Sequence, residues 1–303
     1  MRAEHPGVGV PQVADPEPTA APGGLRAVAR GVWGDRNGRI GVVLTAVLLL
    51  LAVAAVLGLT PQDPLAQHPD DQLQGPSATY WFGTDQFGRD VAARTFAGIA
   101  ASLRVAVLAV AVAALVGSVA GVVAGYLGGL WDQVIGRLTD VLFAFPAVHL
   151  ALAIIAGLGR GWLNTALAIA IVYVPIFVRV SRGPTLAVTS LDHIAACRVL
   201  GFSGRRTVFL HVLPNVSGPV VVQVALALSW AILTEAGLSF LGLGTQPPDP
   251  SLGLMVSETR TLVTTAWWAM TFPALAVVVA VIALNLLGDG LNSALDPKGE
   301  GRR

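Results

Sequence analysis

The sequence predicts an all-α integral membrane protein with six transmembrane helices. Hydrophobic residues make up 54% of the 303 residues and charged residues only 12%, whereas about a quarter of the residues of a typical soluble protein are charged. Mean hydropathy is +0.70. Six stretches are long and apolar enough to cross a hydrocarbon core, which requires about 20 helical residues. They cover residues 40–59, 105–126, 141–158, 162–178, 216–243 and 267–287.

The distribution of basic residues predicts that both termini are cytoplasmic. Basic residues are retained on the cytoplasmic side during membrane insertion. With both termini inside, 14 of the 19 Lys and Arg residues fall in the cytosolic segments 1–39, 127–140, 179–215 and 288–303. The segments 60–104, 159–161 and 244–266 are then external.

The two ends of the chain are expected to be cytosolic tails. Residues 1–39 should be disordered and basic, because Pro, Ala and Gly dominate their first part and four arginines follow. Residues 289–303 form the second tail. We expect 40–59 to be a retained first transmembrane helix, since its apolar run exceeds the roughly 7–15 residues of a signal core and five more spans follow. A cleaved signal peptide is the alternative.

The chain lacks the residue patterns of a nucleotide or zinc site. A P-loop needs a lysine after a glycine-rich turn, and the single lysine, Lys298, stands in the C-terminal tail. Cys197 is the only cysteine, and the histidines are too scattered for zinc-type spacing. We therefore predict no metal, cofactor or nucleic-acid partner for this chain, and any ATPase that drives it must act in trans.

The cytosolic segment 179–215 predicts two short helices. Ser190 can cap a helix over 191–200, and Gly201 can end it in a left-handed conformation. A second helix is expected from Ser203 until Pro214 stops it. Such a compact structure, fixed to the spans on either side, can transmit a rigid-body movement from a partner. An amphipathic loop resting on the membrane surface is the alternative.

Several motifs resemble the C-type permease subunit of bacterial dipeptide and oligopeptide ABC importers. The run ACRVLG at 196–201, followed by LPN at 213–215, resembles the cytoplasmic coupling loop of ABC importer permeases. ILTEAGLSFLGLG at 232–244, FGTDQFGRD at 82–90 and NLLGDGLNSALDP at 285–297 extend the resemblance over about residues 36–298. It implies a type I ABC importer transmembrane domain with its permease core at 105–288.

The resemblance also implies a coupling site. Residues 191–202 would dock into a groove of an ATP-binding subunit. The implied coupling residues are Ala195, Ala196, Arg198, Gly201, Phe202, Arg205, Arg206 and Pro214. The family has an acidic residue before Ala196, and Ala195 stands there instead, so this position cannot supply a salt bridge.

The implied machine has several subunits in the bacterial cytoplasmic membrane. A B-type permease would form a heterodimer with this chain, two ATP-binding subunits would hold ATP and Mg, and an extracytoplasmic solute-binding protein would deliver di- or oligopeptides. The chain itself would be a lipid-embedded transport subunit and no enzyme. Nickel complexes, glutathione or haem are alternative cargoes. A secondary transporter without ATPase partners, or an intramembrane enzyme, are alternatives of another class.

Glu235 is a carboxylate inside the fifth predicted span. Burying it is costly unless it is protonated, paired or facing water. The resemblance makes it a candidate for shaping or gating the translocation path. The alternative is a structural hydrogen bond to a neighbouring helix, with Asn164 or Asn285 as partner.

Three further features complete the site predictions. Residues 80–94 predict an interfacial helix with ion pairs Asp85–Arg89 and Asp90–Arg94 at i,i+4. The resemblance makes Asp85, Arg89 and Asp90 external docking candidates.

A close helix contact is predicted from glycines at four-residue spacing, namely Gly117, Gly121 and Gly125. Pro146 permits a kink in the third span, since it lacks an amide hydrogen.

Overall fold

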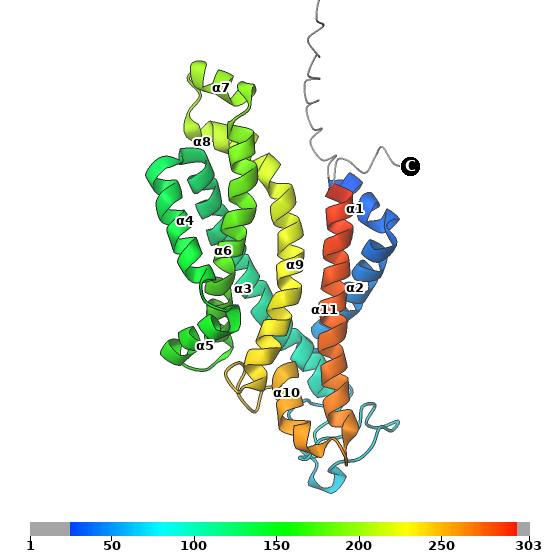
Figure 1. The fold of residues 1–303 in the computed structure, drawn as a ribbon. Coiled ribbons are helices and arrows are strands. Elements are labelled where there is room, and N and C mark those ends of the chain that lie inside the picture. The colour runs from blue at the N-terminus through cyan, green and yellow to red at the C-terminus, as the bar shows by residue number, and fades with distance from the viewer. Residues whose placement is uncertain (1–24, 296–303) are drawn as a thin grey trace, which may run out of the picture.

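The computed structural model describes residues 25–295, which form a bundle of long helices (Figure 1). Within this range every regular element is helical, which confirms the predicted all-α fold. The α-helices are α1 (Leu25–Gly34), α2 (Arg36–Val56), α3 (Val91–Leu127), α4 (Gly129–Phe143), α5 (Ala147–Leu158), α6 (Trp162–Thr189), α7 (Asp192–Val199), α8 (Gly204–Thr207), α9 (Leu213–Phe240), α10 (Leu252–Thr259) and α11 (Trp267–Leu295). Short 3-10 turns η1 (Pro69–Asp71) and η3 (Arg260–Leu262) and a π-helical turn η2 (Val208–Val212) complete the described chain.

Five of these helices are long and apolar enough to cross a membrane: α2, α3, α6, the continuous helix Gly204–Phe240 and α11. The third predicted span, 141–158, is different, because α4 and α5 meet at a break with an angle of 94°. Pro146 precedes α5 at this break, where it supplies no amide hydrogen and disfavours helical geometry in the residue before it. The prediction of six spans holds if α4 and α5 together count as one.

The two ends of the bundle carry different segments. Figure 1 shows α7 and α8 at one end, together with the start of α1 and the end of α11. The connection between α2 and α3, α10 and the turn between α5 and α6 lie at the other end. Both termini of the described chain therefore lie on the same side as α7, as an even number of spans requires.

The predicted boundaries of the first two segments need correction. The expected disorder of 1–39 is wrong for its last part, since α1 occupies Leu25–Gly34, whereas residues 1–24 lie outside the described range. Helix α1 packs on α11, with Val32 buried and Gly31 against Ala294. The last part of the predicted external segment 60–104 is helical, because α3 begins at Val91 and runs for 37 residues.

Helix α3 packs closely along α6 because three glycines face that helix. A Cβ atom on Gly117 would lie 2.6 Å from the carbonyl oxygen of Val174, and one on Gly125 would lie 2.8 Å from the Cβ of Thr185. Gly121 similarly lies against the Val178 carbonyl. Removing side-chain bulk from one stripe allows the two backbones to approach. The three glycines at four-residue spacing thus lie at the contact between α3 and α6.

Candidate functional site

A small apolar cluster fixes residues 191–203, here called the knob, to the bundle. Ile194 of α7 is fully buried. It packs with residues from the end of α3, the end of α6, η2 and α9, namely Val122, Val188, Val212 and Val216. The knob is therefore packed, through one shared apolar cluster, against the ends of α3 and α6 and the start of α9.

The outer surface of the knob carries two large apolar side chains. Val199 is 88% exposed and Leu200 is 71% exposed, and both stand beside Gly201, whose φ of +78° confirms the predicted left-handed end of the helix. Exposed apolar groups at such a tip are typical of a surface that another protein covers. Sequence reasoning missed these two residues, although they lie within the quoted motif.

The predicted coupling residues lie around this tip. Ala195, Ala196, Gly201, Arg205 and Arg206 are exposed, as is Pro214. Phe202 is half-buried, with the guanidinium carbon of Arg206 4.5 Å from the centre of its ring. Only the side chain of Arg198 lies outside the part of the chain that the structure describes.

Two capping predictions in this segment are wrong. The Ser190 hydroxyl donates to the Ala187 carbonyl at the end of α6, so it does not cap α7. Pro214 does not stop the second helix, which continues to Phe240. The π-helical turn before it carries a bond from the Leu213 amide to the Val208 carbonyl, and the Asn215 side chain donates to the His211 carbonyl at 2.7 Å. This wider turn accommodates a proline inside a helix.

Glu235 is fully buried near the opposite end of α9 and accepts three hydrogen bonds. Its donors are serine hydroxyls from three segments: Ser102 of α3 at 2.6 Å, Ser239 of α9 at 2.6 Å and Ser251 before α10 at 3.1 Å. The predicted partners were wrong. Asn164 bonds to the Leu158 and Gly159 carbonyls, and Asn285 accepts from Ser229.

A second buried polar cluster lies at the C-terminal end of α10, which carries Glu258. Arg89 donates to Asp85 at 2.7 Å and to Glu258 at 3.3 Å, and Arg94 lies 3.8 Å from Asp85 and 3.9 Å from Glu258. The predicted Asp85–Arg89 pair therefore forms, but in a turn and not on a helix. The predicted Asp90–Arg94 pair does not form among the described residues, because Asp90 caps α3 and Arg94 faces the other two carboxylates.

Asp90 is buried at the first turn of α3. Its Oδ1 accepts from the Ala92 amide at 2.8 Å, whereas its Oδ2 has no hydrogen-bond partner within the described residues. Burial raises the pKa of the Asp90 carboxyl above its usual range, and the backbone hydrogen bonds partly oppose this. Like Asp85 and Arg89, it is at most 5% exposed, so none of the three docking candidates presents a surface to another protein in this conformation.

The two clusters together hold α10 at both ends. Ser251 at its start bonds to Glu235, and Glu258 near its end faces Arg89 and Arg94. Gly253 lies against the backbone of Ala236, and Gly98 lies against Leu252. Buried polar groups that are fully paired fix one arrangement of the elements that carry them. Helix α10 is therefore held firmly between α3, α9 and the α2–α3 connection.

Comparison with known proteins identifies the family to which this chain belongs. Residues 117–300 match the family described as binding-protein-dependent transport system inner membrane component. The chain belongs to this family. This permease is 38% identical over 306 residues to the dipeptide transport system permease protein DppC of Alkalihalophilus pseudofirmus, covering 98% of this chain and 99% of that protein.

Further relatives of the permease carry a different name. It is 41% identical over 289 residues to the glutathione transport system permease protein GsiD of Escherichia coli O6:K15:H31, covering 94% of this chain and 95% of that protein. The same protein of Salmonella paratyphi A is 41% identical over 288 residues. The alignments thus extend well beyond the matched family region and leave out little of the chain.

Family membership settles the class of the permease. It is a multi-pass protein of the bacterial cytoplasmic membrane and a transport subunit of an ABC importer of the peptide type. The permease family has no cofactor of its own, ATP hydrolysis lies in separate subunits, and a substrate-binding protein completes the importer.

Proposed function

We propose that this permease imports di- or oligopeptides by alternating access, paired with a B-type permease and driven by two ATP-binding subunits that hold ATP and Mg. The similarity to a dipeptide permease over nearly the whole chain supports this cargo. Glutathione, named for other relatives, is the second candidate. It shares amide bonds and free carboxylates with dipeptides, so one path can serve both.

The knob supplies the coupling. Its exposed tip at Val199 and Leu200 is the surface that the ATP-binding subunit covers, and Ile194 carries the movement to α3, α6 and α9. Closure of the ATPase pair would move the knobs of both permeases and turn the path from inward-open to outward-open. Hydrolysis of ATP would then reset it. The burial of Ile194 among four elements is the observation that carries this mechanism.

Glu235 anchors the outer end of the path. Its three hydrogen bonds tie the start of α10 to α3 and α9. Two roles were considered for Glu235, shaping the path and forming a structural hydrogen bond. Both are met here, because Glu235 shapes the outer end of the path by holding α10 in place through hydrogen bonds. The binding protein would contact exposed residues at this end of the bundle, including the turn at Gln246–Asp249. It would not contact Asp85, Arg89 and Asp90, which are buried.

Uptake by the reconstituted importer tests the proposal. Proteoliposomes would contain this permease with its partner permease, ATP-binding subunits and binding protein, and a labelled dipeptide would be supplied outside. We expect uptake that requires internal ATP and that an unlabelled dipeptide suppresses. Suppression by glutathione at lower concentration than by any dipeptide would favour the second cargo. Uptake without ATP would support a secondary transporter.

A further inference from the structure

Four arginines lie where the chain enters its first span. Arg26 and Arg30 belong to α1, and Arg36 and Arg39 belong to the first turn of α2. All four are exposed, and none of them forms an ion pair within the described residues. Asp35, which stands between the two pairs, caps α2 instead. The start of the described chain thus presents cationic charge that no described carboxylate pairs with.

The two arginines of α2 continue an exposed apolar face. Positions 36, 39, 43, 47 and 50 are spaced by three, four, four and three residues, so they share one face of the helix. Val43, Val47 and Leu50 on this face are 51%, 46% and 69% exposed, whereas the opposite face carries the buried residues of α2. Exposed apolar side chains of a span suit lipid tails. Arg36 and Arg39 thus stand at the end of a lipid-facing side of α2.

These two arginines also lie at the depth of the lipid headgroups. The apolar run of the first span begins at Ile40. At about 1.5 Å per residue, Arg39 and Arg36 stand roughly 1.5 and 6 Å outside the hydrocarbon core. A core about 30 Å thick carries headgroup layers of roughly 5–8 Å on each side. Both guanidinium groups can therefore reach the headgroup layer without leaving their helix.

Helix α1 is fixed at the same depth by close packing. A Cβ atom on Gly38 would lie 3.1 Å from a methyl carbon of Val32, and one on Gly290 would lie 3.5 Å from the same carbon. Val32 is buried by these contacts. Because Gly38 stands between Arg36 and Arg39, the end of α1 lies beside the first turn of α2.

A different side of α1 is exposed. Positions 26, 30 and 33 are spaced by four and three residues, so Arg26, Arg30 and Trp33 share that side. Trp33 is 57% exposed. The Nε of Arg30 donates to the Arg26 carbonyl at 3.3 Å, and its two terminal nitrogens remain directed outward from this bond. Tryptophan and arginine together are typical of residues at a membrane interface.

We infer that Arg26, Arg30, Trp33, Arg36 and Arg39 form a binding surface for anionic phospholipid headgroups in the leaflet on the side of the knob. A guanidinium binds a phosphate through two parallel hydrogen bonds, and clustered arginines at a membrane surface attract anionic lipids. Continuity with the exposed apolar face of α2 favours lipid over a second protein. The inference goes beyond the proposed function and holds for any solute.

Quenching of Trp33 fluorescence by brominated lipids tests this surface. The complete importer would be placed in phosphatidylcholine vesicles that contain a small fraction of either brominated phosphatidylglycerol or brominated phosphatidylcholine. Bromine quenches a tryptophan only at close range. Subtracting the signal of a Trp33→Phe importer removes the contribution of the other tryptophans of the chain and of its partners.

We expect brominated phosphatidylglycerol to quench Trp33 at least about twice as strongly as brominated phosphatidylcholine, because arginines near the surface favour anionic lipid. The excess should vanish at an ionic strength of about 1 M, where the Debye length is about 3 Å. Arg26→Gln with Arg30→Gln should remove about half of the excess or more. Arg26→Lys with Arg30→Lys should keep most of it, because the charge remains.

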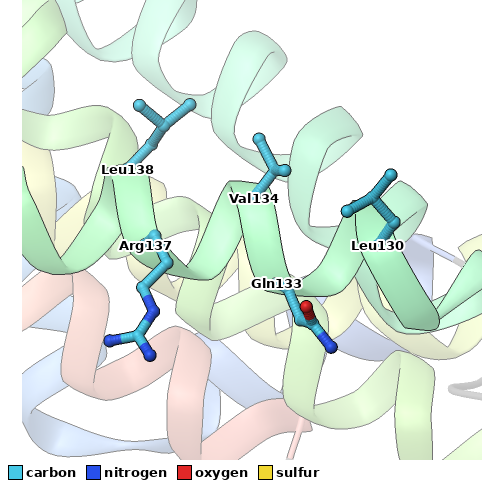
Figure 2. Close-up of a pocket in the computed structure, with 5 residues that line it drawn as sticks. All are labelled: Leu130, Gln133, Val134, Arg137 and Leu138. Atoms are coloured by element: carbon cyan, nitrogen blue, oxygen red, sulfur yellow. The ribbon is translucent and has the colours of Figure 1, made fainter.

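Arg137→Gln is the matched control. Figure 2 shows Arg137 and Gln133 projecting from α4 on the side away from Leu130, Val134 and Leu138. Arg137 is exposed and forms no ion pair within the described range, but it stands on α4, on the other side of the bundle from α2 (Figure 1). Its substitution should leave the quenching of Trp33 unchanged.

Equal quenching by the two lipids in the unaltered importer at low ionic strength would overturn the inference. So would the absence of quenching by either lipid, because a partner subunit would then cover this surface. An excess that survives high ionic strength would show that these arginines do not select the lipid. The salt measurement needs no substitution, so a variant that fails to assemble cannot hide the result.

Discussion

The hydroxyl of Ser102 in α3 donates a hydrogen bond of 2.6 Å to the carboxylate of Glu235 in α9, 133 residues further along the chain. Ser239 and Ser251 donate to the other carboxylate oxygen. A buried acidic side chain in the membrane thus serves as the common acceptor for three separate segments, and the position of α10 depends on it.

Substitution of Glu235 tests this anchoring. Glu235→Gln keeps an acceptor, and the serine hydroxyls can reorient, so assembly and uptake should remain close to those of the unaltered permease. Glu235→Ala leaves three buried hydroxyls without their acceptor, at a cost of roughly 1–3 kcal/mol each. Its importer should show a lowered melting temperature and reduced assembly. Normal assembly of Glu235→Gln with uptake abolished would instead assign the carboxylate a direct part in transport.

The contact between α3 and α6 leaves no room for a side chain at Gly121. A Cβ atom there would overlap the Ser181 hydroxyl and the Val178 carbonyl, so Gly121→Ala should lower the stability of the permease by about 1–3 kcal/mol, as overpacking does. Gly218→Ala in α9 is the matched control, because no atom lies within 4 Å of its added Cβ. Thermal unfolding of both variants in the same detergent would measure the difference. Equal melting temperatures would contradict the close approach.

The ion cluster around Asp85 holds the α2–α3 connection onto α10. Asp85→Asn leaves Arg89 and Arg94 buried with Glu258 alone, and breaking such a cluster costs roughly 3 kcal/mol. We expect faster proteolytic cleavage within residues 60–90 and a lowered melting temperature. Asp70→Asn, on an exposed side chain of the same segment, should change neither. Unchanged protease resistance of Asp85→Asn would show that the cluster does not fix this segment.

The raised pKa of Asp90 predicts a pH dependence. An acid whose pKa is higher in the folded than in the unfolded state destabilises the fold once it ionises, so the cost is absent below its unfolded value of about 3.9 and develops as pH rises through the folded pKa. Asp90→Asn keeps an N-cap and removes this charge. It should therefore melt at a higher temperature than the unaltered permease at pH 7, with a gap that narrows towards about pH 4.

The control for this measurement is Asp35→Asn, at the half-buried N-cap of α2. Its effect on the melting temperature at pH 7 should be smaller than that of Asp90→Asn, because Asp35 is only half-buried. A gap between Asp90→Asn and the unaltered permease that is constant from pH 4 to pH 7, both approximate limits set by the ordinary range of carboxyl pKa values, would contradict the buried, ionised carboxylate.

Much of the fold follows from local sequence features. Runs of apolar residues are sufficient to locate five spans that are single helices, since each must satisfy its backbone internally. Gly201 could be assigned its left-handed conformation because it directly follows a short helix and glycine adopts that conformation without strain. The stripe of three glycines in α3 could be predicted to contact a helix, although the identity of that helix could not.

The remaining features depend on contacts between distant residues. Hydropathy describes how apolar each residue is but not the direction of the helix axis. The 94° break at Pro146 therefore appears in the sequence only as a possible kink. Glu235 could be recognised as needing partners, but serines are common, and no local signal selects Ser102 or Ser251. Glu258 lies 169 residues from Arg89, and the helix expected over 80–94 was wrong because this buried pairing favours a turn before α3.

We propose that the tip of the knob couples ATP hydrolysis to transport. The direct measurement records peptide uptake and ATPase activity together in the importer with the double change Val199→Ser and Leu200→Ser, beside Val263→Ser at the opposite end of the bundle. Because Val199 and Leu200 are largely exposed, the altered permease should fold normally. We predict that it loses most of its uptake and that loaded binding protein no longer stimulates its ATPase, while Val263→Ser behaves as the unaltered permease. Full uptake and full stimulation in the double variant would contradict the account.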